Sequence, residues 1–261
     1  MEKIIYYKDE LNDDFAVTKN HKKKKIDHKY NYRKEKNILW AFFAFLIYYF
    51  IVKPLTHFIM VFGYHYKIIN KKCLKKAKKR GGFIYSNHTN YMPDAFIPNH
   101  LIRRKTYIIV DPTAVSIRGL GNLVVALGAI PLGDTIGAKK NFLKSIKKHS
   151  NKSLVTIYHE AHIWPYYTKI RNFTKDSIKY PIICNRPSYT VTNCYQKRRF
   201  SKKPRIISYV DGPFYPDESL GRNEKIDKLY NDIITSMKNR TNMYSTYEYV
   251  KYVKVSENEV L

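Results

Sequence analysis

The stretch "GFIYSNHTNYMPDAFIPNH", residues 82–100, contains the change of pattern that decides the fold. Its first six residues form a short β-rich run, whereas the residues from Asp94 onward carry apolar side chains at a spacing near 3.6, which is typical of a helix. Pro93 is favourable in the first turn of a helix, and a carboxylate at Asp94 would be stabilised there by the helix dipole. The stretch therefore predicts a strand, a polar loop and a helix in succession.

The same alternation continues on both sides of this stretch. Together with the run at 82–87, further β-rich runs predict strands at residues 64–69, 106–111, 153–160 and 204–210. Helical spacing occupies residues 94–104, 137–149 and 223–240. Because strands that alternate with helices commonly pair in parallel, the pattern predicts an α/β fold with a largely parallel sheet flanked by helices.

Residues 38–52, "ILWAFFAFLIYYFIV", are apolar on every face. As a helix this block would be about 22 Å long, which is short of a hydrocarbon core of about 30 Å. The apolar character resumes after Lys53 and Pro54 and continues to residue 63, so the pieces could form a kinked span, a buried core helix or a helical hairpin embedded in one leaflet. We expect the membrane-embedded hairpin, because lysine-rich segments lie before the block and after it, at residues 71–80.

The charge of the chain requires a negative partner. Lys and Arg number 48 against 21 Asp and Glu, for a formal net charge of +27, which suits a nucleic acid, an anionic membrane or an acidic carrier protein. Residues 1–37 are polar and basic with few apolar positions, so we expect a mobile arm there. The predicted organisation is this arm, membrane-associating helices over 38–63 and an α/β domain over 64–261.

Two side chains beside the expected loop point to chemistry. His88 follows the end of a predicted strand, which is where α/β sheets place their ligands. If the Asp94 carboxylate reaches one imidazole nitrogen, it fixes the tautomer and leaves the other nitrogen as a base for a substrate hydroxyl. The alternative is that Asp94 only caps a helix and His88 is a satisfied core histidine.

Neither a disulfide framework nor a metal site is expected. The three cysteines are odd in number and lack the spacing of a zinc site. The histidines of "HEAH", residues 159–162, are three apart at the end of an expected strand and would point to opposite faces, whereas zinc proteases place theirs four apart on one helical face. We expect a reducing, cytoplasmic environment and no bound metal.

Four short blocks carry a resemblance to a known family. In chain order they are "NHTNYMPD" (87–94), "LGAIPLGD" (127–134), "YHEAHIW" (158–164) and "YPIICN" (180–185). Their order and distances, over roughly residues 64–215, resemble those of the glycerolipid acyltransferases, the 1-acyl-sn-glycerol-3-phosphate acyltransferase-like proteins. The resemblance implies that the first block supplies a catalytic His–Asp dyad and that the fourth block is a strand beginning at a proline.

Two departures from the family pattern affect the expected site. The family has four residues between the histidine and the aspartate, whereas five separate His88 from Asp94, so this dyad must close over a longer turn. The second block of the family commonly ends in an arginine that binds the substrate phosphate, but Asp134 stands at that position. Phosphate binding is therefore expected elsewhere.

The third block keeps its acid and departs from the family in the next three residues. Glu160 is present, but the family's Gly-Thr-Arg is replaced by Ala-His-Ile at residues 161–163. The nearest later cations, Lys169 and Arg171, are candidate phosphate contacts, with solvated loop cations as the alternative. Asn87 and Glu160 are expected to shape the substrate pocket.

The resemblance implies an acyltransferase that moves a fatty acyl group to the free hydroxyl of a lysophosphatidate-like lipid and produces phosphatidate, with His88 as base and Asp94 as its orienter. The acyl donor would be a co-substrate, either an acyl carrier protein thioester, an acyl-CoA or an acyl phosphate, and no cofactor is implied. Expected partners are membrane phospholipids, the lysophospholipid acceptor and an acidic acyl carrier protein, at the cytoplasmic face of a membrane. Two alternatives stay open: a non-catalytic lipid-binding relative, and a basic nucleic-acid-binding protein, which we do not expect because no such motif is present.

Overall fold

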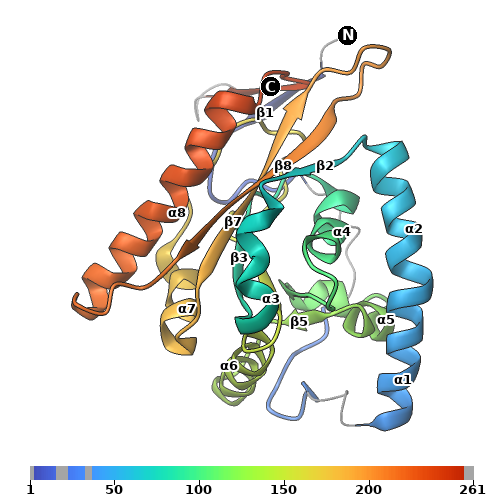
Figure 1. Ribbon diagram of the computed structural model, residues 1–261, viewed down its shortest axis with the longest axis vertical. Helices are drawn as coiled ribbons and strands as arrows, with labels where there is room; N and C mark the ends of the chain where they lie inside the picture. Colours follow the sequence, from blue (N-terminus) through green and yellow to red (C-terminus); the bar gives the residue numbers. More distant parts are fainter. Residues whose placement is uncertain (1–2, 16–22, 33–36, 256–261) are drawn as a thin grey trace.

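A seven-stranded sheet forms the centre of the molecule (Figure 1). The structure is a computed structural model that describes residues 3–15, 23–32 and 37–255. The strand order is β2-β8-β7-β3-β6-β4-β5, and every neighbouring pair is parallel except β7 and β8. The strands are β2 (Lys67–Ile69), β3 (Gly82–Ser86), β4 (Tyr107–Val110), β5 (Ala129–Pro131), β6 (Leu154–Tyr158), β7 (Ser188–Gln196) and β8 (Arg205–Phe214).

Helices cover both faces of this sheet. Phe83 and Tyr85 of β3 join a buried cluster with α6, α7 and α8, whereas Ile84 joins a second cluster with α3 and α4. This is the alternation of side chains expected of a strand that is buried on both faces. The helices are α3 (Ala77–Arg80), α4 (Tyr91–Leu101), α5 (Gly121–Ala126), α6 (Ile136–Ser150), α7 (Lys179–Cys184) and α8 (Arg222–Tyr244).

The predicted α/β alternation and the largely parallel sheet are confirmed. All five expected strands are present as β2, β3, β4, β6 and β8, and the three expected helices are α4, α6 and α8. The strands β5 and β7 were not predicted. Strand β5 is only three residues long, and β7 is a run of mixed polar and apolar residues, so neither has a strong pattern.

The fourth sequence block is not a strand. Its residues, 180–185, lie in α7 and its C-cap. Pro181 sits in the first turn of that helix, where its missing N–H costs nothing, and Asn185 ends the helix in the left-handed conformation with φ of 46°. The strand that follows a proline is β7, which begins directly after Pro187. A short apolar run without a clear period does not distinguish a helix from a strand.

The expected hairpin at Lys53 and Pro54 is also wrong, because the apolar block forms one continuous helix of 26 residues, Ile38–Gly63. It consists of α1 (Ile38–Leu46), the π-helical η2 (Ile47–Val52), α2 (Lys53–Phe58) and the π-helical η3 (Ile59–Gly63). The N–H of Lys53 bonds to the carbonyl of Tyr48, five residues back. This wider turn relieves the clash that a proline ring makes in a regular helix, so the chain continues without reversing.

One side of this apolar helix is fastened to the α/β domain. The hydroxyl of Tyr48 donates to Asn99 Oδ1 at 2.9 Å, Lys53 Nζ donates to the carbonyl of Ile102 at 3.0 Å, and Met60 is fully buried in the α3 and α4 cluster. The other side exposes large apolar side chains, namely those of Ile38, Leu39, Phe42, Phe43, Phe45, Phe50, Ile51, Leu55, Phe58 and Phe62. By length and composition the helix could cross a membrane.

The described parts of residues 1–37 are not a mobile arm. Strand β1 (Lys3–Tyr7) pairs in parallel with β9 (Val250–Lys254) in a separate two-stranded sheet. Ile26 is fully buried, and its N–H donates to Asp134 Oδ2 at 2.7 Å. Main-chain pairing and a few anchoring side chains fix the position of these residues, although their polar composition alone predicts a mobile segment. The expectation for residues 1–2, 16–22 and 33–36 lies outside the described residues.

Candidate functional site

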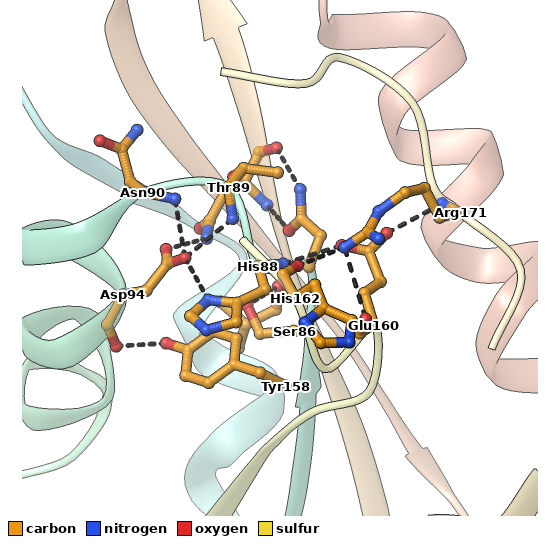
Figure 2. Close-up of polar contacts among 12 residues, drawn as sticks. Ser86, His88, Thr89, Asn90, Asp94, Tyr158, Glu160, His162 and Arg171 are labelled. Atoms are coloured by element: carbon orange, nitrogen blue, oxygen red, sulfur yellow. Dashed lines mark hydrogen bonds and ion pairs between the residues drawn. The ribbon is translucent and has the colours of Figure 1, made fainter. Parts of the chain in front are cut away.

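His88 and Asp94 meet at the carboxyl end of the parallel strands. His88 lies two residues beyond β3, and Asp94 lies in the first turn of α4. His88 Nδ1 is 2.8 Å from Asp94 Oδ2 (Figure 2). The backbone N–H groups of Thr89 and Asn90 donate to the same oxygen, each at 2.8 Å. The longer loop therefore closes over the carboxylate, which satisfies two amides that precede the helix.

The His88 ring is held on its face as well as at Nδ1. It stacks on Tyr158 with ring centroids 4.5 Å apart and an interplanar angle of 24°. The hydroxyl of Tyr158 donates in turn to the main-chain carbonyl of Asp94, as Figure 2 shows. The side chain of His88 is 19% exposed, against 2% for Asp94. Nε2 has no hydrogen-bond partner among the residues that the structure describes, so this nitrogen is available to a ligand.

Two effects of opposite sign act on the Asp94 carboxyl. Burial raises its pKa, because desolvation disfavours the charged form, and the hydrogen bonds from His88, Asn90 and Thr89 oppose that rise. The donors are the His88 ring and the backbone N–H groups of Thr89 and Asn90. Burial is the larger effect, so the pKa of Asp94 lies above its ordinary value although three donors stabilise the carboxylate.

The strand β7 contributes two site residues that the sequence did not indicate. Asn193 exchanges main-chain hydrogen bonds with the Asn87 amide, accepting from Nδ2 at 3.0 Å and donating to Oδ1 at 2.8 Å. The hydroxyl of Tyr195 donates to Thr89 Oγ1 at 2.7 Å and accepts from Asn90 Nδ2 at 3.0 Å. Asn87 thus ties the loop that contains His88 and Asp94 to the neighbouring strand. No signal in the sequence identified these residues, because β7 itself was not predicted.

Glu160 supports the dyad from the end of β6. Its Oε2 accepts from the N–H of His88 at 2.9 Å, and its Oε1 accepts from the N–H of Arg171 at 2.8 Å. Burial raises the pKa of Glu160, and the Arg171 guanidinium and the backbone donors oppose the rise. The carboxylate therefore positions the main chain that carries the histidine and leaves the ring free.

Arg171 is not the exposed phosphate contact that we expected. Its side chain is 1% exposed and lies 3.7 Å from Glu160 Oε2. The guanidinium also donates to the carbonyls of His162 and Glu10, and it packs over the Trp164 ring at 4.6 Å. A buried carboxylate needs a cation, and Arg171 supplies it. Lys169, two residues earlier, is exposed.

Asp134 has a structural role at the position where the family has its arginine. Its N–H donates to the carbonyl of Ile26 at 2.9 Å, and its Oδ2 accepts from the N–H of Ile26. The carboxylate thus anchors the N-terminal segment against the end of β5. An arginine could not accept that second bond.

The two histidines of "HEAH" occupy different surroundings. His159 is 8% exposed and packs on Phe173 with ring centroids 4.0 Å apart. His162 Nδ1 lies 3.3 Å from Asp14 Oδ2 in a half-exposed pair. Within residues 3–15, 23–32 and 37–255, no group of three or more His, Cys, Asp and Glu side chains is placed to hold a metal ion.

His159 predicts an acid sensitivity of the fold. Burial lowers its pKa from 6.5 to about 3, so the unfolded chain binds a proton below about pH 6.5 that the native chain does not. The contribution of neutral His159 to the free energy of unfolding is therefore fully present above that pH and is lost as the pH falls toward 3. Between pH 7 and pH 4.5, we expect the free energy of unfolding to fall by about 2 kcal/mol less in His159→Phe than in the parent chain.

The check is the unfolding free energy of both proteins at the two pH values. Any packing change made by the phenyl ring is present at both pH values and cancels in the difference. Equal pH dependence of His159→Phe and the parent chain would show that His159 is not buried in its neutral form.

Comparisons with known proteins reveal a structural likeness. No protein-family model and no curated protein matches the chain. Among solved structures, the chain is similar to the 1-acyl-sn-glycerophosphate (LPA) acyltransferase PlsC from Thermotoga maritima, at 14% sequence identity and a TM-score of 0.48. The similarity covers 79% of this chain and 98% of that chain. A likeness at this level does not assign an activity, so the geometry of the site has to support one.

Proposed function

We propose that the chain is a membrane-bound acyltransferase that moves a fatty acyl group from an activated carrier to the free hydroxyl of a lysophosphatidate-like glycerolipid. Phosphatidate would be the product. One observation carries the proposal: His88 Nδ1 lies 2.8 Å from a buried carboxylate while the ring keeps a partly exposed edge. The first and third sequence blocks, which resemble those of the glycerolipid acyltransferases and supply His88, Asp94 and Glu160, agree with this assignment.

In the proposed reaction, His88 Nε2 takes the proton of the acceptor hydroxyl as the hydroxyl oxygen attacks the acyl carbonyl carbon. Asp94 holds the ring in the tautomer that leaves Nε2 unprotonated and stabilises the imidazolium that forms. The tetrahedral intermediate then collapses, and the carrier thiolate or phosphate leaves with the proton from His88. An ester bond forms, the carrier bond breaks, and the histidine returns to its neutral form. The scheme requires no covalent acyl-enzyme, metal or cofactor.

We assign supporting roles to the residues around the dyad. Asn87, Glu160 and Arg171 are positioning residues: Asn87 ties the loop to β7, Glu160 accepts from the His88 N–H, and Arg171 pairs with Glu160. Lys169 stays a candidate contact for the acceptor phosphate. The donor is proposed to be an acyl carrier protein thioester, an acyl-CoA or an acyl phosphate.

A panel assay tests this proposal. The purified full-length chain is incubated with each class of acyl donor and with lysophosphatidate, glycerol phosphate and neutral lysolipids as acceptors, and the products are identified by mass. We expect one phosphorylated acceptor to gain an acyl group. Lipid binding without any product across the panel would instead favour a non-catalytic lipid-binding protein.

We also propose that the apolar helix attaches the chain to one membrane leaflet, on the cytoplasmic side. The α/β domain lies alongside the helix, with contacts at Tyr48, Lys53 and Met60, and not beyond one of its ends (Figure 1). A crossing helix would draw the polar surface of the domain into the hydrocarbon, which is costly. A helix that lies along the leaflet buries only its exposed apolar face.

This arrangement predicts attachment through apolar burial. High salt should leave the parent chain on the membrane, because salt screens charge and does not weaken apolar burial. Phe50→Asp combined with Phe58→Asp should release it, since each phenyl ring contributes roughly 1.5 to 3 kcal/mol when buried. Both side chains are more than half exposed on the protein, at 68% and 61%, so the fold should survive.

Membrane flotation with and without high salt measures the effect. The matched control places the same substitutions at Ile136 and Met243, which are exposed apolar residues outside the helix, and it should stay membrane-bound. Release of the parent chain by salt alone would refute apolar attachment.

A further inference from the structure

The turn between β7 and β8 is a strongly basic surface that the proposed reaction does not use. Residues 197–204 read "KRRFSKKP" and contain five cations and no acid. We call these residues the basic turn. Phe200 within it is 88% exposed, and the Arg199 guanidinium lies over its ring at 5.1 Å. The exposed cations of the basic turn are Lys197, Arg199, Lys202 and Lys203.

The charge of the basic turn is not neutralised by its own hairpin. No Asp or Glu occurs between Asp176 and Asp211, an interval that includes the whole of β7 and most of β8. Asp211 itself pairs with Arg240 of α8, at 2.6 Å. The turn therefore presents a net positive field to whatever approaches it.

The basic turn lies beside the end of the apolar helix. Arg198 Nη2 donates to the carbonyl of Gly63, the last residue of that helix, at 2.8 Å, and Nε donates to the carbonyl of Pro204 at 3.1 Å. Phe62, next to Gly63, is 64% exposed. Figure 1 shows the β7–β8 hairpin projecting from the sheet at the end where this helix finishes. The apolar face and the basic turn are therefore neighbours on the surface.

The same strand connects the basic turn to the dyad. Val191 of β7 pairs with Ser86 at the end of β3, and β7 continues to Gln196. That extension contains Asn193 and Tyr195, which hold the loop between His88 and Asp94. The basic turn thus projects from the edge of the sheet at which the histidine lies.

We propose that the basic turn is a second membrane contact, which binds an anionic leaflet through its cations and places Phe200 among the headgroups. This inference rests on the membrane attachment proposed above and adds a dependence on lipid charge to it. An exposed aromatic ring in a segment of exposed cations suits the boundary between headgroups and acyl chains. Continuity with the apolar face of the helix favours a lipid surface over an acidic protein.

A second contact would also position the site. The apolar helix and the basic turn together would fix the orientation of the domain on the leaflet, whereas one helix alone permits rotation about its axis. The edge of the sheet that carries His88 would then lie near the surface from which a lysolipid is drawn. The cations would also raise the local concentration of an anionic lipid.

The experiment compares three full-length proteins in flotation with vesicles and without any acyl donor. They are the parent chain, the turn variant R199E/K202E/K203E and a matched control, K140E/K144E/K147E, which reverses three exposed lysines of α6. Figure 1 places α6 at the opposite end of the molecule from the hairpin. The vesicles are phosphatidylcholine alone or phosphatidylcholine with phosphatidylglycerol, at low salt. Melting temperatures establish that all three proteins are folded.

We expect the turn variant to bind the anionic vesicles about tenfold or more weakly than the parent chain, since each cation at an anionic surface strengthens binding severalfold. The control should lose much less, and all three proteins should bind neutral vesicles equally through the helix. Phe200→Ser should also weaken binding to anionic vesicles while the charge is unchanged.

Equal loss in the turn variant and the control would overturn the proposal, because net charge and not the turn would then decide. Unchanged vesicle binding with lost binding to an acidic acyl carrier protein would overturn it in favour of a protein partner. Failure of the parent chain to bind neutral vesicles would count against attachment by the helix. Absence of acyl transfer in the panel assay would count against the proposed enzyme activity. Both results differ from a loss of binding that is confined to anionic vesicles.

Discussion

The variant His88→Ala should lose acyl transfer by roughly 10²- to 10⁴-fold in turnover, because a positioned general base contributes about that much. The loss should appear in kcat with little change in KM for the acyl donor, since the ring acts on the hydroxyl proton during the reaction. Removal of the ring takes one donor from Asp94 Oδ2 but leaves the Thr89 and Asn90 N–H groups bound to it, so the fold and membrane binding should stay intact.

A matched control isolates the base from the loop. His162→Ala makes the same chemical change on a neighbouring loop, at a side chain that pairs with Asp14 and does not touch the dyad. It should retain nearly full turnover. Turnover of His88→Ala near that of the parent chain, with an equal melting temperature, would show that His88 is not the base.

Asp94→Asn should lower turnover by at least about 10²-fold. The amide keeps the size of the side chain but removes the negative charge that stabilises the imidazolium. It also adds an N–H₂ group to a position where every neighbouring group donates, because Thr89 and Asn90 both direct N–H groups at the carboxylate. One orientation of the amide would hold His88 in the tautomer that has no free base at Nε2.

Asp134→Asn is the control for this change. The Asp134 carboxylate also accepts a main-chain hydrogen bond at the carboxyl edge of the sheet, but the donor is the Ile26 N–H and no histidine takes part. Asparagine can accept the same bond, so turnover should change little. A mild effect of Asp94→Asn, comparable to that of the control, would mean that another group orients the His88 ring.

The fold could be predicted where the pattern was long and periodic. Helix α8, with 23 residues, is the clearest such case. Strands β3 and β6 are short, but both were predicted because each is an apolar run with clear ends. The sequence was ambiguous at 180–185, where six residues fit a helix or a strand. It was also ambiguous at Pro54, where the π-helical η2 lets the helix continue past the proline. Those outcomes depend on tertiary packing and on local backbone adjustment, which a periodicity does not contain.

The site was predictable in its centre and not in its support. The positions of His88 and Asp94 after a strand left a capping role for Asp94 open, and the family resemblance implied a dyad. The structure places His88 Nδ1 2.8 Å from Asp94 Oδ2. Asn193 and Tyr195 lie more than a hundred positions away from the loop in sequence, so only the pairing of β7 with β3 brings them there. Arg171 was expected near a phosphate because it is a cation, but the buried Glu160 carboxylate takes it as a partner.

The central claim is that His88 activates the free hydroxyl of a lysolipid for attack on an acyl carbonyl. The most direct measurement uses lysophosphatidate whose free hydroxyl carries a heavy oxygen isotope, with the acyl donor that the panel selects, and reads the mass of the product. Acyl transfer to that hydroxyl predicts a diacyl product that retains the label in its new ester, formed by the parent chain and not by His88→Ala. A product without the label, or the same labelled product from both proteins at equal rates, would contradict the account.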